Sequence, residues 1–556
     1  MTKRTGGQLL IDALIANETD TIFGVPGESY LEALDAIYER RNKINFITCR
    51  QEGGAAYMAD GYANATGKPG VCFVTRGPGV ANASIGLHTA YQGSTPMILL
   101  IGQIPRHQME REAFQEINYK QMLGPITKWV AQIDQVERIP EFINRAMSIA
   151  MSGRPGPVAL ALPEDMLRDM AEVDDLPPAV LPKSVPAPDD IDTMSELLKN
   201  AKRPLMVLGG GSWNAQGRAA IHQFVERNAI PVASGFRRQD LFDNTHPCYI
   251  GNLGFGSFQQ LLDYVPSCDL IIAVGSRLAD ATVRKYTLVK APKPTQKLVH
   301  VLSSPDELGR VLTPDVAICC DLNQFAQKVN KTAPVENPVW ADLCTELAQG
   351  FQSNLFLGPQ TGPVDMGKIM EYLRANLPDD AIITNGAGNY ADWPNKMFTY
   401  KSAHTTLAPI SGAMGYSVPS AVAAKQAFPD RVVVSFAGDG DFLMNGQEIA
   451  TAVQYNLNPI ILVINNSSYG TIRMHQENRH PDRVSGTDLV NPDFAAFARS
   501  FGANGEVIEA TEQFIPAFER ALASNTATLL ELRVGPDSFG PDTSISKLKK
   551  SQETKG

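Results

Sequence analysis

Residues 438–445 read Gly-Asp-Gly-Asp-Phe-Leu-Met-Asn, and after a helix-like stretch they are followed by the apolar run 460–464 and the pair Asn465-Asn466. A strand-like run, 432–436, leads into Asp439, and the spacing of the apolar residues after it predicts a helix. Asn466 ends the next strand-like run. Both side chains are therefore expected at the carboxyl ends of neighbouring parallel strands, where open α/β sheets bind ligands.

The residue types at these strand ends suit a metal-bridged diphosphate. Asp439 offers a carboxylate oxygen and Asn466 an amide oxygen, and Mg²⁺ takes a few protein oxygens of this kind beside water and phosphates. Gly438 and Gly440 would let backbone N–H groups approach phosphates at a helix start, where the helix dipole favours anions. A lone Gly-Asp-Gly is usually only a tight turn. Here the register of strand, helix, strand and Asn-Asn favours the ligand site.

Composition argues against several classes of protein. With 556 residues, 44% of them hydrophobic, the chain is long enough for several domains with ample cores. A net charge of −10 argues against a nucleic-acid surface, and no uncharged apolar run approaches the length of a membrane span. Asp12 and Glu18 interrupt what would be the apolar part of a secretory signal, and the seven cysteines form neither a paired framework nor a metal-ligand spacing. We expect a reduced, cytoplasmic protein.

Alternating strand-like and helix-like stretches divide the chain into three α/β blocks. The expected domains are an N-terminal one over 1–170, a central one over 190–335 and a C-terminal one over 360–540. The proline- and acid-rich stretch 176–189 predicts an exposed linker, and a second loop-rich join is expected over 334–363. The polar, lysine-rich residues 546–556 predict a mobile tail.

The Gly-Asp-Gly motif followed by Asn-Asn resembles the signature of thiamine-diphosphate enzymes. Matched position by position, the metal ligands of that family fall on Asp439, Asn466 and the backbone carbonyl of Ser468, and the spacing, 466 − 439 = 27, fits the family. The resemblance implies thiamine diphosphate and Mg²⁺ as cofactors. It also implies an α/β fold of three doubly wound parallel-sheet domains: a pyrimidine-binding domain, a central domain and a diphosphate-binding domain.

In the first block, Glu52 is surrounded by small residues at a predicted helix start, in the stretch Arg-Gln-Glu-Gly-Gly-Ala-Ala (50–56). Small neighbours would let a flat ring pack against the carboxyl group. The stretch resembles the activating-glutamate motif of the family, which implies that Glu52 bonds N1′ of the aminopyrimidine and so promotes deprotonation of the thiazolium C2. Taken alone, Glu52 could equally be a helix-start carboxylate stabilised by the helix dipole.

Two stretches of the third block resemble family loops around the cofactor. Residues 411–416 match a segment whose large apolar residue bends the cofactor, which makes Met414 the candidate; a methionine in an apolar segment is more often core filling. Residues 385–390 match a loop that closes over the diphosphate, although such a loop also occurs as a plain turn. The cofactor-binding residues implied in this block are Gly388, Asn389, Tyr390, Gly412, Met414, Gly438, Gly440, Asp441 and Gly470.

One cofactor must contact both Glu52 and Asp439, which lie 439 − 52 = 387 residues apart in different blocks. Members of the family place the site between the first block of one subunit and the third block of another. The resemblance therefore implies a homodimer or a homotetramer with active sites between subunits. The sequence by itself requires only that the two blocks meet.

Within this superfamily the chain resembles acetolactate synthases over nearly its whole length. The matching stretches are 75–79, 102–103, 113–116 and 275–278. By this resemblance Phe114 and Gln115 line the catalytic pocket, and the substrates are small-molecule 2-keto acids. The implied reaction is carboligation, in which a keto acid loses CO₂ and the remaining fragment adds to a second carbonyl compound.

Three departures from the synthase pattern bear on this reaction. Glu28 stands where the synthases usually have a glycine and pyruvate decarboxylases an acid, so it could protonate the reacting fragment and release an aldehyde; it could equally be a helix-start carboxylate that points to water. His475 replaces a tryptophan of the acceptor pocket, which predicts a broader choice of acceptor. Residues 278–283 replace an acidic, arginine-containing segment near the flavin.

Alternative functions and the flavin stay open at this point. A 2-keto acid decarboxylase or 2-hydroxyacyl lyase is the second possibility, and a non-catalytic cofactor-binding relic is a third, against which the intact Glu52, Asp439 and Asn466 argue. The glycines 209–211 and Arg277 are compatible with FAD along the central block, but glycine after a strand is equally a tight turn. Because 278–283 departs from the synthase pattern, we expect FAD to be absent or non-catalytic.

Overall fold

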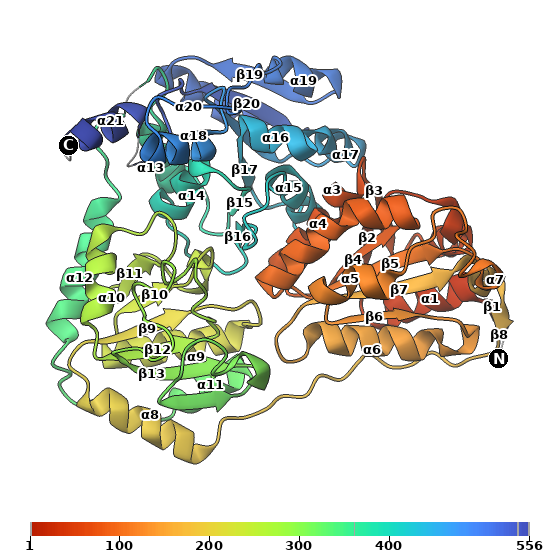
Figure 1. Cartoon of the computed structure of the whole chain (residues 1–556), viewed down its shortest axis with the longest axis horizontal. Coiled ribbons are helices and arrows are strands. Elements are labelled where there is room, and N and C mark those ends of the chain that lie inside the picture. Colours follow the sequence, from red (N-terminus) through yellow and green to blue (C-terminus); the bar gives the residue numbers. More distant parts are fainter. Residues whose placement is uncertain (1–2, 361, 542–543, 554–556) are drawn as a thin grey trace.

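The computed structural model describes residues 3–360, 362–541 and 544–553 and contains three six-stranded parallel sheets with helices on both faces (Figure 1). The sheets lie within residues 21–163, 204–319 and 382–533. A short antiparallel pair, β1 (Arg4–Thr5) with β8 (Met170–Ala171), joins the two ends of the first block. The predicted fold class, three doubly wound α/β domains, is confirmed, and the residue boundaries given to the domains stay predictions.

The N-terminal sheet has the strand order β3-β2-β4-β5-β7-β6. Its strands are β2 (Thr21–Gly24), β3 (Asn45–Thr48), β4 (Gly70–Val74), β5 (Met97–Gln103), β6 (Trp129–Gln132) and β7 (Pro157–Pro163). One face is covered by α1 (Gly6–Ala16), α2 (Leu31–Glu39) and α6 (Ile139–Met151), and the other by α3 (Glu52–Thr66) and α4 (Gly77–Gly93). Every residue of β4, β5 and β7 is buried, which explains why these strands are continuous apolar runs.

The central sheet has the strand order β11-β10-β9-β12-β13-β14. Its strands are β9 (Pro204–Leu208), β10 (Val232–Ser234), β11 (Tyr249–Asn252), β12 (Leu270–Val274), β13 (Lys297–Leu302) and β14 (Val316–Cys319). The helices of this block are α8 (Pro188–Asn200), α9 (Ala215–Asn228), α10 (Gln259–Ser267) and α11 (Leu322–Val329).

The expectation of a loop-rich join over 334–363 is wrong, because α12 (Ala341–Asn354) occupies 14 of these residues. Its buried side chains, Cys344, Leu347, Ala348 and Phe351, follow helical spacing and form the face that packs against β11. Residues 172–187 contain neither helix nor strand, in agreement with the predicted linker.

The C-terminal sheet has the strand order β16-β15-β17-β18-β20-β19. Its strands are β15 (Ile382–Asn385), β16 (Thr406–Leu407), β17 (Val433–Gly438), β18 (Ile460–Asn465), β19 (Asn504–Ile508) and β20 (Thr528–Arg533). Its helices are α13 (Met366–Asn376), α14 (Asp392–Met397), α15 (Ser417–Ala427), α16 (Asp439–Asn445), α17 (Ile449–Gln454), α18 (Gly470–Arg479), α19 (Phe494–Ser500) and α20 (Phe514–Leu522). Gly438 pairs with Ile464 in parallel register, so Asp439 and Asn466 follow neighbouring strand ends as predicted.

The first and third blocks meet where α3 packs against α15 (Figure 1). A Cβ on Gly61 would lie only 2.9 Å from the Cα of Ser420, so the close approach of the two backbones requires glycine there. The Tyr416 hydroxyl donates to Oδ2 of buried Asp60 across the same contact, at 2.7 Å. The small residues that follow Glu52 along α3 therefore serve the contact between two domains.

The tail predicted for 546–556 is in part a helix, α21 (Ile545–Glu553), and residues 554–556 lie outside the described part of the chain. Lys549 of this helix pairs with Asp482 at 2.5 Å. Among the described residues, no helix is both long and apolar enough to cross a lipid bilayer.

Candidate active site

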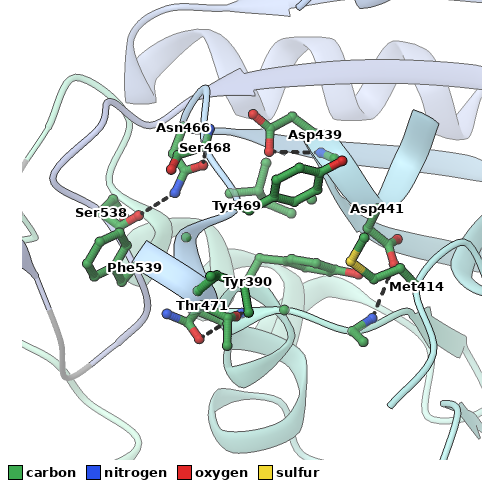
Figure 2. A pocket seen from close by; sticks show the side chains of 18 of the residues that line it. Tyr390, Met414, Asp439, Asp441, Asn466, Ser468, Tyr469, Thr471, Ser538 and Phe539 are labelled. Atoms are coloured by element: carbon green, nitrogen blue, oxygen red, sulfur yellow. Dashed lines mark hydrogen bonds between the residues drawn. The ribbon is translucent and has the colours of Figure 1, made fainter. Parts of the chain in front are cut away.

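A cavity of about 220 Å³ opens at the carboxyl ends of β15, β17 and β18 (Figure 2). All of its lining residues belong to the C-terminal block, between Ala387 and Phe539. The lining includes every metal and cofactor candidate from the sequence, which are Gly388, Asn389, Tyr390, Gly412, Met414, Gly438, Asp439, Gly440, Asp441, Asn466, Ser468 and Gly470. Four separate stretches of sequence are thus brought to one place.

Asp439 is the first residue of α16 and is almost fully buried. Its Oδ1 accepts a hydrogen bond from Gly440 N at 3.0 Å, and its Oδ2 accepts one from Nδ2 of Asn491 at 2.8 Å. Burial raises the pKa of Asp439 above its usual value, and these hydrogen bonds offset part of that rise. The hydrogen-bond donors around this carboxylate are neutral, so a cation placed beside it would compensate a buried charge.

Asn466 and Ser468 lie beside Asp439 in the turn after β18 (Figure 2). Ser467, with φ of +55°, reverses the chain in this turn. The Asn466 side chain accepts from Ser468 N at 3.2 Å and donates to the Ser538 carbonyl at 3.1 Å. One carboxylate, one amide oxygen and a nearby backbone carbonyl form a set of hard oxygen donors that fits Mg²⁺.

Within the described residues, no three histidine, cysteine, aspartate or glutamate side chains gather in a group that could hold a metal ion. The predicted magnesium site has a single carboxylate, so it is not a cluster of this kind. Mg²⁺ takes oxygen ligands, keeps several waters and binds phosphates directly, so a site with one carboxylate, the Asn466 amide oxygen and a backbone carbonyl fits it.

The glycines of the Gly-Asp-Gly motif are explained by two aromatic rings. A Cβ on Gly438 would lie 2.6 Å from the ring of Tyr390, and a Cβ on Gly440 would lie 2.4 Å from the ring of Tyr469. Both rings line the cavity (Figure 2). The motif therefore leaves room for the walls of the cavity as well as for a ligand.

Asp441 holds two of the cavity loops together. Its Oδ1 accepts from Gly415 N at 2.9 Å and from Ala387 N at 3.2 Å, and its Oδ2 accepts from the Ser417 hydroxyl at 3.0 Å. Burial raises its pKa, and these donors counteract the rise. Both oxygens are engaged by the protein, so Asp441 joins the loops that carry Met414 and Gly388.

Several cavity residues were not foreseen from the sequence. Thr471 donates to Oδ1 of Asn389 at 2.7 Å and accepts from Asn389 N at 2.9 Å, which fixes the loop after β15. In the sequence, the feature that could have pointed to Thr471 is its position directly after the candidate Gly470. Phe539 lines the cavity, and Asn491 bonds Asp439 from outside the lining. Both come from loops distant in sequence, and no motif pointed to them.

Three of the four catalytic candidates lie together in the N-terminal block. Glu28 follows β2, Glu52 follows β3 and Gln115 follows β5, so they share the carboxyl edge of the N-terminal sheet. Glu52 accepts a hydrogen bond at Oε2 from Nδ2 of Asn82, at 2.9 Å; Asn82 was not foreseen. Gln115 adopts a φ of +68°, and its carbonyl accepts from Gly77 N. None of the three lines the cavity of the same chain.

Glu28 is ion-paired rather than directed only to water. Its carboxylate lies 3.0 Å from Nη2 of Arg76, and its side chain is 69% exposed. Arg76 is buried and also pairs with Glu164 at 3.4 Å. The simple alternative, a solvated carboxylate at a helix start, therefore describes Glu28 incompletely.

His475 lies on α18, the helix whose first residues line the cavity, but its own side chain is exposed and outside that lining. Phe114 is likewise 74% exposed. In a single chain, neither residue touches the cavity.

Comparison with known families agrees with this arrangement. Residues 4–122 match the N-terminal TPP binding domain of thiamine pyrophosphate enzymes, 191–329 match their central domain and 386–532 match their C-terminal TPP binding domain. The chain belongs to the thiamine pyrophosphate enzyme family.

Curated relatives narrow the comparison. The acetolactate synthase large subunit of Parasynechococcus marenigrum is 32% identical over 95% of this chain and 87% of its own length. A probable acetolactate synthase large subunit of Methanocaldococcus jannaschii is 31% identical over 96% of this chain and 92% of its own. The isozyme 2 large subunit of Escherichia coli is 29% identical over 95% of both chains.

Proposed function

We propose that the protein is a thiamine-diphosphate- and Mg²⁺-dependent carboligase that acts on 2-keto acids. The observation that carries the proposal is the buried Asp439 carboxylate, whose hydrogen-bond donors are neutral, in a cavity that also contains Asn466 and Ser468. The relatives named acetolactate synthase support the carboligase reading over other reactions of this family.

Each residue has a definite task in this proposal. Asp439, Asn466 and the carbonyl of Ser468 would hold the metal. The apolar side chain of Met414 would pack against the cofactor and hold it in a bent conformation. Glu52 would hold a proton at the aminopyrimidine nitrogen. When bound, thiamine diphosphate supplies the nucleophilic carbon that attacks a keto acid and stabilises the fragment left after CO₂ departs.

Glu52 requires a second copy of the chain in this proposal. The cavity is lined by residues 387–539, and Glu52 lies at the edge of another sheet. A homodimer with closed symmetry, or a tetramer built from two such dimers, would place Glu52, Glu28 and Gln115 of one subunit against the cavity of the other.

A decarboxylase or 2-hydroxyacyl lyase is the second candidate, and it depends on Glu28. Arg76 contacts Oε1 of Glu28 at 3.0 Å, so Oε2 is the oxygen that would carry a proton to a substrate. The relatives named acetolactate synthase favour carboligation as the main outcome.

Product analysis tests the proposal. Purified protein would be incubated with pyruvate, thiamine diphosphate and Mg²⁺, and the products would be identified by mass spectrometry. Acetolactate or a mixed carboligation product supports the proposal. Acetaldehyde alone would select the decarboxylase, and no turnover of any 2-keto acid would contradict both.

The groove at the carboxyl ends of the central strands is where FAD would lie. It contains Gly209, Gly210 and Arg277, and Arg277 donates to the Gln92 carbonyl at 2.8 Å. Burial and the neighbouring Arg154 lower the pKa of Arg277 to about 10. We expect FAD to be absent or non-catalytic, and stoichiometric flavin absorbance in the purified protein would contradict this.

A further inference from the structure

Another buried carboxylate, that of Glu448, lies against the turn that precedes Glu52. It ends the short 3-10 helix η8 (Gly446–Glu448) of the C-terminal block and has no exposed surface. Its Oε1 accepts from Arg50 N and from Gln51 N, each at 3.0 Å, and Oε2 accepts from Arg50 N at 3.2 Å. Thr451 also donates to Oε2, at 2.5 Å.

The N-terminal block is shaped to receive this carboxylate. Gly54 lies in the first turn of α3, and a Cβ there would come within 2.6 Å of Oε1 of Glu448. A carboxylate at this place faces the N-terminal end of α3, where the helix dipole favours negative charge. Glu448, which lies 398 residues after Arg50 in the sequence, thus accepts the backbone hydrogen bonds of the turn that leads into Glu52.

We propose that Glu448 is a positioning residue for Glu52, and that it fixes the two peptide groups from which the Glu52 helix begins. The inference rests on the proposed function, in which Glu52 acts on the cofactor of a second subunit. Glu448 does not line the cavity of its own chain. Its effect is therefore on the direction of the Glu52 side chain, without a contact to metal or diphosphate.

The same short segment serves two sites in the proposed dimer. Asp439 is the first residue of α16, and Glu448 follows nine residues later, 448 − 439 = 9, as the last residue of η8, which lies between α16 and α17. In each subunit this segment would therefore hold the metal of that subunit's own cavity. It would also orient the same subunit's Glu52, which reaches the cofactor in the cavity of the partner subunit. A displacement of the segment would reach both active sites.

The test compares Glu448→Gln with Tyr455→Phe in the full-length protein. Glutamine keeps one acceptor oxygen in place of Oε1 but puts an NH₂ donor in place of Oε2, so the 3.2 Å bond from Arg50 N is lost and two donors face each other there. The substitution also removes the negative charge at the N-terminal end of α3. Tyr455 is the matched control, because its hydroxyl accepts from Thr48 N at 2.8 Å and donates to the Phe46 carbonyl at 3.1 Å across the same domain contact. It does not bond the Arg50–Gln51 turn.

Three measurements are made on each variant. They are the affinity for thiamine diphosphate with Mg²⁺, the rate at which C2–H of bound thiamine diphosphate exchanges with deuterium, and amide exchange of peptides spanning 48–54 in the cofactor-free protein. For Glu448→Gln we expect unchanged affinity, faster amide exchange at Arg50 and Gln51, and C2 exchange slower by roughly tenfold to a hundredfold, the cost of a small misplacement. Tyr455→Phe should keep the C2 exchange rate.

Gly54→Ala provides an independent variant if Glu448→Gln does not fold. Its methyl group displaces the carboxylate of Glu448 without removing it, and it should slow C2 exchange in the same way. Wild-type C2 exchange in either folded variant, or an equal loss in Tyr455→Phe, would overturn the inference. Glu52→Gln is the reference: if it too exchanges at the wild-type rate, the proposed function of Glu52 fails instead.

Discussion

Asn491 donates its amide hydrogen to Oδ2 of Asp439 at 2.8 Å, and the same amide group donates to Oδ1 of Asn465 at 3.0 Å. A residue from the loop before α19 thereby links the ends of β17 and β18. This link leaves Asp439 and the turn after β18 at a fixed separation, which a shared metal ion requires.

The first prediction concerns this link and the metal. Asp439→Ala and Asn466→Ala should each weaken Mg²⁺ and thiamine diphosphate binding together, because each removes an oxygen ligand. Asn491→Ala should cost less, roughly 10–100-fold in metal affinity, as an outer partner of a ligand does. Calorimetric titration gives all three values. Equal cofactor affinity in wild type and in both ligand variants would remove the metal assignment.

The second prediction concerns pH. The pKa of Asp439 is raised by burial, so its protonated form, which cannot bind a metal, persists to higher pH than in a free aspartate. As the pH falls, Mg²⁺ affinity should therefore begin to drop above the ordinary value of 3.8 and be lost below the raised pKa. Titrations at a series of pH values locate the midpoint. A midpoint at or below 3.8 contradicts the effect of burial.

The third prediction concerns Asp441. Asp441→Ala leaves the N–H groups of Gly415 and Ala387 and the Ser417 hydroxyl without this acceptor. Because an unsatisfied buried group costs about 1–3 kcal/mol, we expect several kcal/mol of lost stability and weaker cofactor binding. Chemical denaturation of the cofactor-free protein measures the free energy of unfolding. A loss of cofactor affinity at unchanged stability would instead mean that Asp441 contacts the cofactor directly.

The fourth prediction concerns Glu52. Glu52→Gln should fold and bind the cofactor but lose most of its activity, since an amide cannot supply the acid function needed at the aminopyrimidine. Steady-state assays and a binding titration separate the two effects. Near-normal turnover would exclude Glu52 from the mechanism.

The fifth prediction concerns product choice. Glu28→Gly should lower the fraction of aldehyde released. His475→Trp should narrow the choice of acceptor, and the change in the free energy of discrimination between acceptors should be a few kcal/mol at most. The matched control is Glu164→Gln, which removes the other carboxylate paired with Arg76. Products from competing acceptors are quantified for each variant. If the two substitutions leave ratio and profile unchanged, these departures from the synthase pattern carry no functional meaning.

The parts of the site that directly follow strands could be predicted from the sequence, because neighbouring residues in the chain indicate them. The continuous apolar runs of β17 and β18 indicate buried parallel strands, and polar residues directly after them mark the ligand edge. The helix α12 was missed because prolines on both sides of it, at 334, 338, 359 and 363, indicated a loop, while only four of its residues are buried at helical spacing.

The remaining site residues depend on tertiary contacts that leave no local signal. Asn82 reaches Glu52 from the adjacent helix α4, and Asn491 reaches Asp439 from a loop. Glu448 was inside the predicted helical stretch, where its spacing is that of an ordinary helix residue. Only the packing of the first block on the third shows what it bonds.

The contact of α3 with α15 has a consequence for how the chain can be divided. One apolar cluster contains residues of both blocks, among them Ala56, Leu99, Val422, Phe442 and Ile461, so neither block has a complete interior by itself. The connection 172–187, in contrast, has no helix or strand of its own. Two separately produced fragments, cut within this connection, would each expose part of that shared interior. Their reassembly into one particle would be driven by this shared apolar surface, and we expect the same surface to couple the unfolding of the two outer domains in the intact chain.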